Sequence, residues 1–478
     1  MTRPGKKSRS IVWFRGKDLR LGDHQPLRAA LDEGGELIPL FVLDPYFFAP
    51  KRARELPHRI QFLLESLVEL DRALRERGSQ LVLVPGKSVD VVPELVRRLS
   101  VQRVHAQRWV EPFARERDRR VAESLRESFV LHEGELLLPP GSLRSGSGGP
   151  YAVFTHFAKA FMRQAPAFSP LPTPKRLPNV PAEVAELSVP IPSCSDLGFE
   201  RNERLLEGGE RKARARLKKF LGGAASQYKE ERDRLDLNGT SRLSADLHFG
   251  TLSVRQVWSA SLKASEDTVD RHAFLNELLW REFAHSTLWD RPELLEKPFR
   301  EKFAGFPWQT NEAHWRAWAD GRTGYPIVDA AARQLLGEGF VHNRARMIAA
   351  SFLTKHLLID YRKGEAHYLK YLTDGDWASN NAGWQWSAGC GCDAQPYFRV
   401  FNPVTQGKKF DPYGDYVRRW VPELGGLPAR TIHCPWEASP LELRAANVRL
   451  GENYPEPIVE HRFARERFLG LAAEHLRT

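Results

Sequence analysis

The sequence has few cysteines and no long apolar run. Four cysteines in 478 residues are too few for a disulfide scaffold, so a reducing cytosol is the expected compartment. No stretch reaches the roughly 18–20 apolar residues of a membrane span. The basic start MTRPGKKSRS has neither the apolar core nor the cleavage site of a secretory leader. We therefore expect a cytoplasmic protein without a membrane segment.

The N-terminal part also lacks the glycine-rich fingerprint of a dinucleotide site. The first apolar strand is followed by Arg15-Gly16-Lys17 and not by G-x-G-x-x-G. Short apolar strands nevertheless alternate with amphipathic helical patterns. The predicted strands are 10–14, 36–43, 80–86 and 101–107, and the predicted helices are 57–76 and 88–99. This alternation predicts βαβ units and a parallel, Rossmann-like sheet that does not hold a standard dinucleotide.

Prolines separate this part from the rest of the chain. Residues 166–192 contain eight of them, which excludes regular helix or a central strand and predicts a stiff connector over the surface. From about residue 205 the pattern is helical, as in 273–286, 327–337 and 343–358. The predicted domains are an α/β domain over 1–138, a connector over 139–205 and a larger all-α domain over 206–478.

Charge and aromatic content point to a polyanionic partner. The formal net charge is +11, and eleven of the thirteen tryptophans lie between Trp258 and Trp436. Arginines bind a phosphate backbone and aromatic rings stack on exposed bases. The densest basic run, 211–219, fits either a solvated helix face or a nucleic-acid contact. Gly239, followed by hydroxyl side chains before a helical run, fits either a capped helix or a phosphate site.

Two segments carry the most specific chemistry. In HNRARM, helical spacing puts Asn343 and Met347 on one face and turns Arg346 partly away; this fits a cavity for a flat heterocycle or a plain capped helix. In 374–403, Trp384 and Trp386 are separated by about 200° on a helix, so their rings face opposite sides. Cys390-Gly-Cys392 lacks a second ligand cluster, and we expect buried thiols and no metal.

The motifs together resemble the photolyase/cryptochrome flavoprotein family, and within it the class I cyclobutane pyrimidine dimer photolyases. GTSRLS, TGYPIVDAAARQL, HNRARM, NNAGWQW and PYFRVFNPVTQGKKFDP occur in that order. The resemblance covers nearly the whole chain and implies a deoxyribodipyrimidine photo-lyase. The expected reaction is light-dependent DNA repair by electron transfer from excited reduced FAD to a cyclobutane pyrimidine dimer flipped out of UV-damaged DNA.

The resemblance also implies a cofactor site. FAD would be bound in the helical domain, and a second antenna chromophore, a deazaflavin or a folate, would belong to the α/β domain if one is present. Asn380 matches the residue that faces flavin N5, and Arg346 matches the partner of Asp374. The residues implied for FAD are Tyr228, Thr240, Ser241, Leu243, Ser244, Arg346, Asp374, Asp376 and Asn380.

Further positions match the family's lesion contacts and its electron relay. The implied lesion and DNA contacts are Arg232, Glu277, Trp280, Asn343, Arg344, Met347, Trp386 and Arg399. Glu277 is also implied in stabilising charge in the dimer. The relay that reduces oxidised flavin would run from Trp384 through Tyr361 to Trp308. Tyr361 stands where the family usually has tryptophan, and tyrosine is harder to oxidise. We therefore expect photoreduction to be slow or to run through Trp318, Trp377 or another neighbour.

Two rival functions remain at this point. A cryptochrome-type photoreceptor would bind FAD without repairing DNA; the asparagine at position 343, where (6-4) photolyases and animal cryptochromes have histidine, favours the cyclobutane substrate. A helical nucleic-acid-binding protein without catalysis is the second rival. We expect a monomer that acts on UV-damaged DNA.

Overall fold

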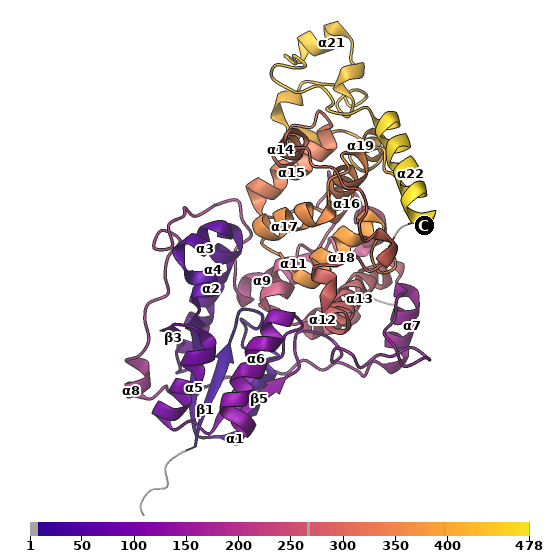
Figure 1. Ribbon diagram of the computed structural model, residues 1–478. Coiled ribbons are helices and arrows are strands. Elements are labelled where there is room, and N and C mark those ends of the chain that lie inside the picture. The colour runs from indigo at the N-terminus through magenta and orange to yellow at the C-terminus, as the bar shows by residue number, and fades with distance from the viewer. Residues whose placement is uncertain (1–7, 265–267, 395, 397, 478) are drawn as a thin grey trace, which may run out of the picture. The chain divides into compact units, whose positions relative to one another are not determined.

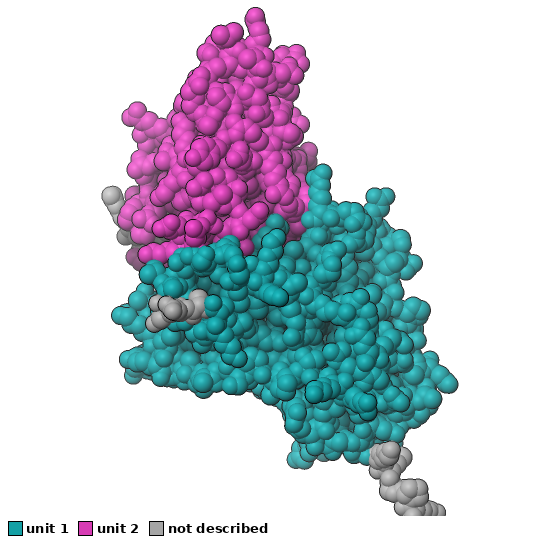
Figure 2. All heavy atoms as spheres, turned by 180° about the vertical axis from the view of Figure 1, so that it is seen from behind, with its two compact units in different colours: residues 1–151, 155–226, 241–292 teal, residues 152–154, 227–240, 293–478 magenta. Residues whose placement is uncertain are grey.

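The computed structural model describes residues 8–264, 268–394, 396 and 398–477 (Figure 1). The chain divides into two compact units (Figure 2). The first comprises 1–151, 155–226 and 241–292, and the second comprises 152–154, 227–240 and 293–478. The predicted domain boundaries at 138 and 205 stay a prediction. In the described part of the chain, no helix has the length and apolarity needed to cross a membrane.

A five-stranded parallel sheet with the order β3-β2-β1-β4-β5 forms the centre of the first unit. Its strands are β1 (Arg9–Phe14), β2 (Glu36–Leu43), β3 (Val82–Pro85), β4 (Arg103–Gln107) and β5 (Phe129–His132). The predicted parallel sheet is confirmed. The sequence analysis did not predict β5, because this strand has only four residues and all of them are half-buried.

Helices cover both faces of the sheet, which explains why β1 and β2 carry apolar residues on both faces. Ile11 and Trp13 point to the face that packs on α5 (Ser88–Leu99) and α6 (Pro112–Leu125). Val12 and Phe14 point to the opposite face, on α1 (Gln25–Glu33) and α4 (Pro57–Arg75). The unit's other α-helices are α2 (Pro45–Phe48), α3 (Pro50–Glu55), α7 (Phe154–Gln164), α8 (Ala182–Ala185), α9 (Glu210–Leu221), α11 (Ser244–Phe249), α12 (Val254–Ala264) and α13 (Val269–Asp290). The short helix α8 lies within 166–192, so the expectation of no helix there is wrong for these residues; α8 directly follows Pro181, and proline is tolerated at the start of a helix.

The second unit is helical, as predicted for the C-terminal part. It contains α10 (Tyr228–Glu231), α14 (Glu312–Ala319), α15 (Pro326–Glu338), α16 (Asn343–Ser351), α17 (Tyr361–Tyr371), α18 (Trp377–Ala388), α19 (Pro403–Phe410), α20 (Asp415–Trp420), α21 (Pro440–Ala445) and α22 (His461–Arg477). Trp318, Phe352, Tyr368 and Phe468 are among its fully buried side chains. Gly364 lets α17 approach α18 closely, because a Cβ at this position would collide with the ring of Trp384.

One predicted helix ends early. The helical pattern over 343–358 predicts a single helix, but α16 ends at Ser351 and a π-helical turn, η5 (Phe352–His356), follows it. In this turn the N–H of Leu357 bonds to the carbonyl of Phe352, five residues earlier. The wider turn changes the direction of the side chains that follow. Periodicity alone does not reveal it.

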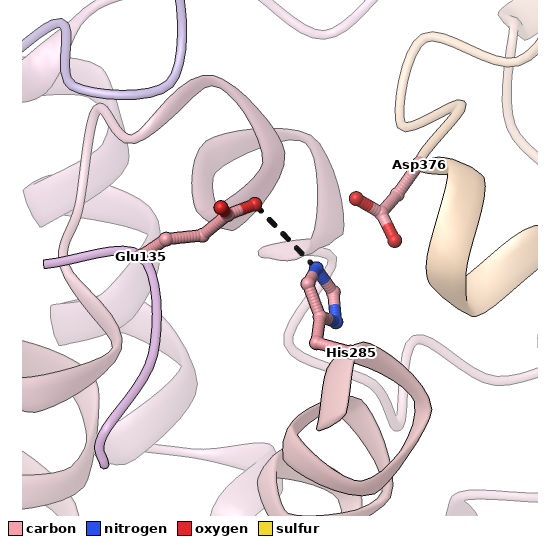
Figure 3. A group of neighbouring side chains, drawn as sticks. All are labelled: Glu135, His285 and Asp376. Atoms are coloured by element: carbon pink, nitrogen blue, oxygen red, sulfur yellow. Dashed lines mark ion pairs between the residues drawn. The ribbon is translucent and has the colours of Figure 1, made fainter. Parts of the chain in front are cut away.

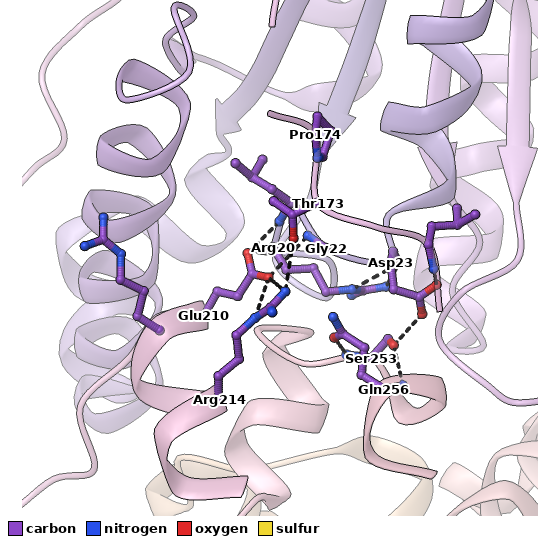
Figure 4. Close-up of polar contacts among 12 residues, drawn as sticks. Arg20, Gly22, Asp23, Thr173, Pro174, Glu210, Arg214, Ser253 and Gln256 are labelled. Carbon is purple, nitrogen blue, oxygen red and sulfur yellow. Dashed lines mark hydrogen bonds and ion pairs between the residues drawn. The ribbon is translucent and has the colours of Figure 1, made fainter. Parts of the chain in front are cut away.

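The loop after β1 ties several segments of the first unit together (Figure 4). Arg20, which is fully buried, donates hydrogen bonds to the backbone oxygens of Asp23 and Gly250. Asp23 accepts from the N–H of Leu171 in the proline-rich segment, and its other carboxylate oxygen bonds Ser253 at the start of α12. The loop therefore links the sheet to the proline-rich segment 166–192 and to the residues between α11 and α12.

Gly250, whose carbonyl accepts from Arg20, is a sensitive position beside this loop. A Cβ there would collide with the backbone carbonyl of Lys17, and its φ of +63° is one that other residues adopt only with strain. We expect Gly250→Ala to lower the free energy of unfolding by about 1–3 kcal/mol, as overpacking and backbone strain do, measured by urea denaturation. Gly146→Ala, whose Cβ meets open space, is the matched control, and equal stability of the two variants would contradict the expectation.

Candidate active site

The acidic turn before α18 holds an arginine from α16. Arg346 places Nη2 2.8 Å from Asp374 Oδ2 and 3.1 Å from Oδ1, and its Nε donates to the carbonyl of Val341. Asp374 is buried, so the ion pair offsets the cost of removing its charge from water. The two residues that the sequence analysis paired are therefore in contact within the second unit.

The start of α18 orients two further predicted cofactor residues. Asp376 caps the helix by accepting from the N–H of Ser379 at 2.8 Å. One turn on, Asn380 Nδ2 donates to the backbone oxygen of Glu365 on α17 at 3.0 Å. This bond turns the Asn380 carbonyl oxygen away from Glu365 and leaves it as an acceptor. The buried hydroxyl of Thr373 has no partner among the described residues.

These groups fit the chemistry of a reduced flavin. The acceptor oxygen of Asn380 would suit an N–H donor such as that of a reduced flavin, and the guanidinium of Arg346 would stabilise an anionic ring. The unpartnered Thr373 hydroxyl adds a polar atom for the same kind of ligand. The donor set of the second unit is therefore compatible with the predicted cofactor.

The two tryptophans of α18 lie on opposite faces. Trp384 is only 3% exposed, whereas Trp386 is half-buried. The centroid of the Trp384 ring lies 5.1 Å from that of Tyr368 and 6.0 Å from that of Trp318. Trp318 in turn stacks on Trp315 at 5.5 Å. An aromatic chain thus leads from Trp384 to Trp315, which is half-buried.

The predicted middle ring of the relay is poorly suited to its role. Among the described residues, Tyr361 makes no ring contact with Trp384, and its buried hydroxyl has no hydrogen-bond partner. Burial raises the pKa of the Tyr361 phenol well above its ordinary value. A tyrosine is oxidised readily only when its proton leaves as well, and no acceptor is bonded to it here. Trp308, the predicted outer ring, packs on Phe306 at 4.5 Å.

Sequence reasoning named Trp318 as an alternative carrier but missed Trp315 and Tyr368. Trp315 and Trp318 are three residues apart on α14. This spacing puts both rings on one helix face and was a signal that could have found the pair. Nothing in the sequence indicated that this face meets α18.

A cavity of about 650 Å³ adjoins α16 in the second unit. Arg344 is held at its wall by Asp233, 2.9 Å away, and by the ring of Phe410, whose centroid lies 4.3 Å from the guanidinium carbon. The lining residues are Glu230, Asp233, Arg234, Arg344, Arg399, Val400, Phe401, Asn402, Thr405, Gln406, Lys409 and Phe410. Four basic and two acidic side chains give the wall an excess of positive charge.

Two of the predicted DNA contacts, Arg344 and Arg399, line this cavity. On the same helix, the amide of Asn343 lies 3.8 Å from the sulfur of Met347, so these two residues share a face as expected. The sequence analysis missed Lys409 and Gln406, although both lie in the motif that it quoted. The buried amide oxygen of Gln406 lacks a partner among the described residues.

The remaining predicted residues are divided between the units. In the second unit, Tyr228 begins α10, and the Arg232 guanidinium lies 5.8 Å from its ring; Thr240 is in the following loop. In the first unit, Glu277 and Trp280 lie one turn apart on α13. Ser241, Leu243 and Ser244 lie before or at the start of α11, which has six residues.

The basic run of α9 is largely neutralised. Four of its six basic side chains form ion pairs with acidic residues of the first unit. The pairs are Arg211 with Glu69 and Glu76, Lys212 with Glu207, Arg214 with Glu210, and Arg216 with Asp246. This favours the solvated-face interpretation over a nucleic-acid contact.

A buried ionic cluster is formed by residues that follow β1, β4 and β5 in the chain; β1 and β4 are the neighbouring strands at which the strand order reverses, where doubly wound sheets bind ligands. Lys17 pairs with Glu111 and Glu135, and His285 on α13 lies 3.6 Å from Glu135 (Figure 3). Burial opposes ionisation of Glu135, but Lys17 and His285 outweigh it and hold the pKa of this carboxyl below its ordinary value.

The two cysteines of the Cys390-Gly391-Cys392 segment differ in burial. Cys390 is fully buried, and burial raises the pKa of its thiol to about 12, so it remains a neutral apolar group. Cys392 is half-buried, with its sulfur 3.3 Å from the carbonyl of Ala152.

Two family models match separate parts of the chain. The model described as DNA photolyase matches residues 10–176, and the model described as the FAD binding domain of DNA photolyase matches residues 274–474. Together with the parallel sheet and the helical unit, these matches define a photolyase-type flavoprotein. The chain belongs to the DNA photolyase family.

Known relatives agree with this assignment over the full length. A deoxyribodipyrimidine photo-lyase of Agrobacterium fabrum is 41% identical, with 97% of each chain covered. The structure of a class III photolyase from Agrobacterium tumefaciens has a TM-score of 0.92 at 39% identity, covering 100% of both chains. A Synechocystis cryptochrome has a TM-score of 0.90 at 30% identity, covering 98% of this chain and 100% of its own.

These matches confirm the predicted family, the predicted enzyme class of deoxyribodipyrimidine photo-lyase and the predicted FAD cofactor. The finer assignment to class I stays a prediction, since one similar structure is of a protein named a class III photolyase.

Proposed function

We propose that this protein repairs cyclobutane pyrimidine dimers in UV-damaged DNA under blue light. One observation supports it most directly: helix α16 carries one residue that lines the cationic cavity and another that belongs to the predicted flavin site. Arg344 lines the cationic cavity, and Arg346, two residues later, pairs with the buried Asp374. A single rigid helix therefore couples a surface suited to phosphates with a pocket suited to a flavin.

FAD, when bound and reduced, would supply an electron to the dimer after excitation and accept it back, so that no net oxidation occurs. Asp374, Asp376, Asn380 and Arg346 would hold the isoalloxazine and ribityl parts from the second unit. Tyr228, Thr240, Ser241, Leu243 and Ser244 would contact the phosphates and ribityl chain. A second chromophore, deazaflavin or folate, stays a prediction and would have to bind outside the ionic cluster formed by residues that follow β1, β4 and β5.

The chain's own residues would bind and orient the damaged strand. Arg344 and Arg399 would contact phosphates, assisted by Arg232, while Asn343 and Met347 would offer an amide and a sulfur to the lesion. Glu277 would accept a hydrogen bond from a base edge, and Trp280 and Trp386 would stack on the extruded dimer. A dimer stacks poorly in the duplex, so its extrusion costs less than that of a normal pair.

The test is repair of UV-irradiated oligo(dT) by reduced protein under blue light. We expect recovery of intact thymines in the light and none in the dark. A protein that holds FAD but restores no thymine would favour the alternative, a cryptochrome-type photoreceptor, which the likeness to the Synechocystis cryptochrome supports. We further propose that the protein acts as a cytoplasmic monomer.

The ring of Trp386 gives a direct test of lesion binding. Because the ring is half-buried on the face of α18 opposite Trp384, we expect Trp386→Ala to weaken binding of damaged DNA by about 1–3 kcal/mol, the contribution of one stacked base. FAD content should be unchanged. Trp386→Phe keeps a ring and should bind close to wild type in the same anisotropy titration. Loss of FAD in the alanine variant would show that the ring faces the cofactor instead.

A further inference from the structure

Lys355 is an unusual residue in the core of the second unit. It lies in the π-helical turn η5 and is completely buried. Within the described residues no carboxylate forms an ion pair with it; its ammonium donates one hydrogen bond, to the backbone oxygen of Arg399 at 2.9 Å. A buried ammonium without a counter-charge costs free energy that a methionine of similar length would avoid.

The hydrogen bond of Lys355 fixes the segment that forms one wall of the cationic cavity. Arg399 and the following residues Val400, Phe401 and Asn402 line that cavity, and Asn402 then caps α19 by accepting from the N–H groups of Val404 and Thr405. The Arg399 side chain itself is exposed. The backbone is thus anchored from inside while the guanidinium faces solvent.

The departure from α-helical geometry gives Lys355 this direction. Had the helix continued from α16 with regular geometry, the side chains after Phe352 would have followed the α-helical period. The π-turn, closed by the bond from Leu357 N–H to the Phe352 carbonyl, breaks that period. π-turns inside helices occur frequently at functional sites. Here the turn contains Lys355, whose buried ammonium contacts the backbone of the segment around Arg399.

We propose that Lys355 is a positioning residue for DNA binding: its ammonium holds the backbone of Arg399 so that the guanidinium is presented to the DNA phosphates. This role rests on the proposed function, since it presumes that the cavity receives DNA. Charge-assisted hydrogen bonds are the strong ones, and a preorganised loop loses less conformational entropy when it binds.

If Lys355 has this role, the affinity for DNA depends on whether its side chain is protonated. Burial lowers the pKa of its ammonium to about 7, with the Cys390 thiol and the Arg399 guanidinium as further influences. Below this value the bond to Arg399 is charge-assisted, and above it a neutral amine donates more weakly. DNA affinity should therefore fall as the pH rises from about 6 to 8.

Other titratable groups around Lys355 do not produce this change. Burial lowers the pKa of the adjacent His356 to about 3, and burial raises that of the Cys390 thiol to about 12, so both stay neutral between pH 6 and 8. From α22, burial lowers the pKa of His461 below its ordinary value, which favours the neutral imidazole. Burial also lowers the pKa of Arg467, but from a value so high that the guanidinium stays charged.

The experiment measures dissociation constants of the FAD-containing protein for UV-irradiated and for undamaged oligo(dT) in the dark, at pH 6.5 and 8.5. We expect Lys355→Met to weaken binding of both DNAs by about five- to tenfold at pH 6.5 and to remove the pH dependence. Lys370→Met, which changes an exposed lysine of α17, should leave both constants unchanged.

A double-mutant cycle with Arg399→Ala separates positioning from a general structural effect. If Lys355 acts through Arg399, the double variant should bind no more weakly than Arg399→Ala alone. Additive losses, or wild-type affinity of Lys355→Met, would overturn the role of Lys355. Wild-type protein that binds neither DNA would overturn the proposed function and this inference together.

FAD absorbance and thermal stability serve as folding controls, and both should stay at wild-type level or rise in Lys355→Met. If the methionine variant loses FAD, Lys355→Gln replaces it, because the amide keeps an N–H donor without the charge. Its affinity should lose its dependence on pH between 6.5 and 8.5, and a retained dependence would overturn the proposal.

Discussion

Trp318→Phe is expected to slow light-driven reduction of the oxidised flavin by about tenfold or more, equivalent to about 1.4 kcal/mol in the barrier. Tyr361→Phe should leave the rate within about twofold of wild type. The reason is the aromatic chain in the second unit: Trp384 contacts Trp318 at 6.0 Å, and Trp318 stacks on Trp315 at 5.5 Å. Once Trp384 has given up an electron, Trp318 is a tryptophan in direct ring contact that can replace it.

The two variants are separated by the chemistry of their side chains. Phenylalanine is far harder to oxidise than an indole, so Trp318→Phe interrupts the chain. It also removes the hydrogen bond from Trp318 Nε1 to the carbonyl of Ala349, so FAD content and thermal stability are measured beside the rate. Tyr361 keeps its proton because its hydroxyl is buried without an acceptor. Removing that hydroxyl therefore takes nothing from electron transfer.

The measurement is the bleaching of oxidised flavin absorbance under blue light with an external reductant. Trp420→Phe, in a packed region of the same unit, is the matched control and should behave as wild type. Repair by chemically reduced protein should be unaffected in all variants. A slow Tyr361→Phe variant beside a normal Trp318→Phe variant would return the relay to the route through Tyr361 and Trp308.

Much of the fold follows from local sequence pattern. Strands such as Ile11 to Phe14 are apolar on both faces, and this is what a parallel sheet covered on both sides requires. The helix over 57–75 was predicted within one residue, because its apolar stripe is long and begins at a proline. Residues 129–132 escaped prediction because a short, half-buried edge strand has no distinct pattern.

The site could be predicted only where local geometry decides it. The shared face of Asn343 and Met347, and the opposite faces of Trp384 and Trp386, follow from 100° per residue on a helix. The pairing of Trp384 with Trp318 depends on how α14 meets α18, and the bond from Lys355 to Arg399 depends on a π-turn and a loop. These contacts are set by tertiary packing, which sequence periodicity does not encode.

Glu365→Gln is expected to stabilise the protein by about 3 kcal/mol at pH 8 and by much less at pH 5. Glu365 is buried on α17, where its carboxylate accepts from Asn381 Nδ2 at 3.0 Å. Burial raises the pKa of this carboxyl to about 7 from an ordinary value of 4.5. The folded state therefore keeps a proton that the unfolded chain loses between pH 4.5 and 7, so the free energy of unfolding falls as the pH rises through this window.

Glutamine is neutral at every pH and can still accept a hydrogen bond from Asn381, so the variant avoids this loss of stability at high pH. A pKa difference of about 2.5 units corresponds to about 3 kcal/mol. Urea denaturation of the FAD-containing proteins at pH 5 and 8 gives the difference directly, and Glu456→Gln, at an exposed carboxyl, should shift neither curve. Since Asn380 is bonded to the backbone oxygen of Glu365 and not to its side chain, FAD content should stay at wild-type level. Parallel pH curves for wild type and Glu365→Gln would mean that the carboxyl is ionised in the folded protein, and a loss of FAD would mean that its side chain contributes to the cofactor site.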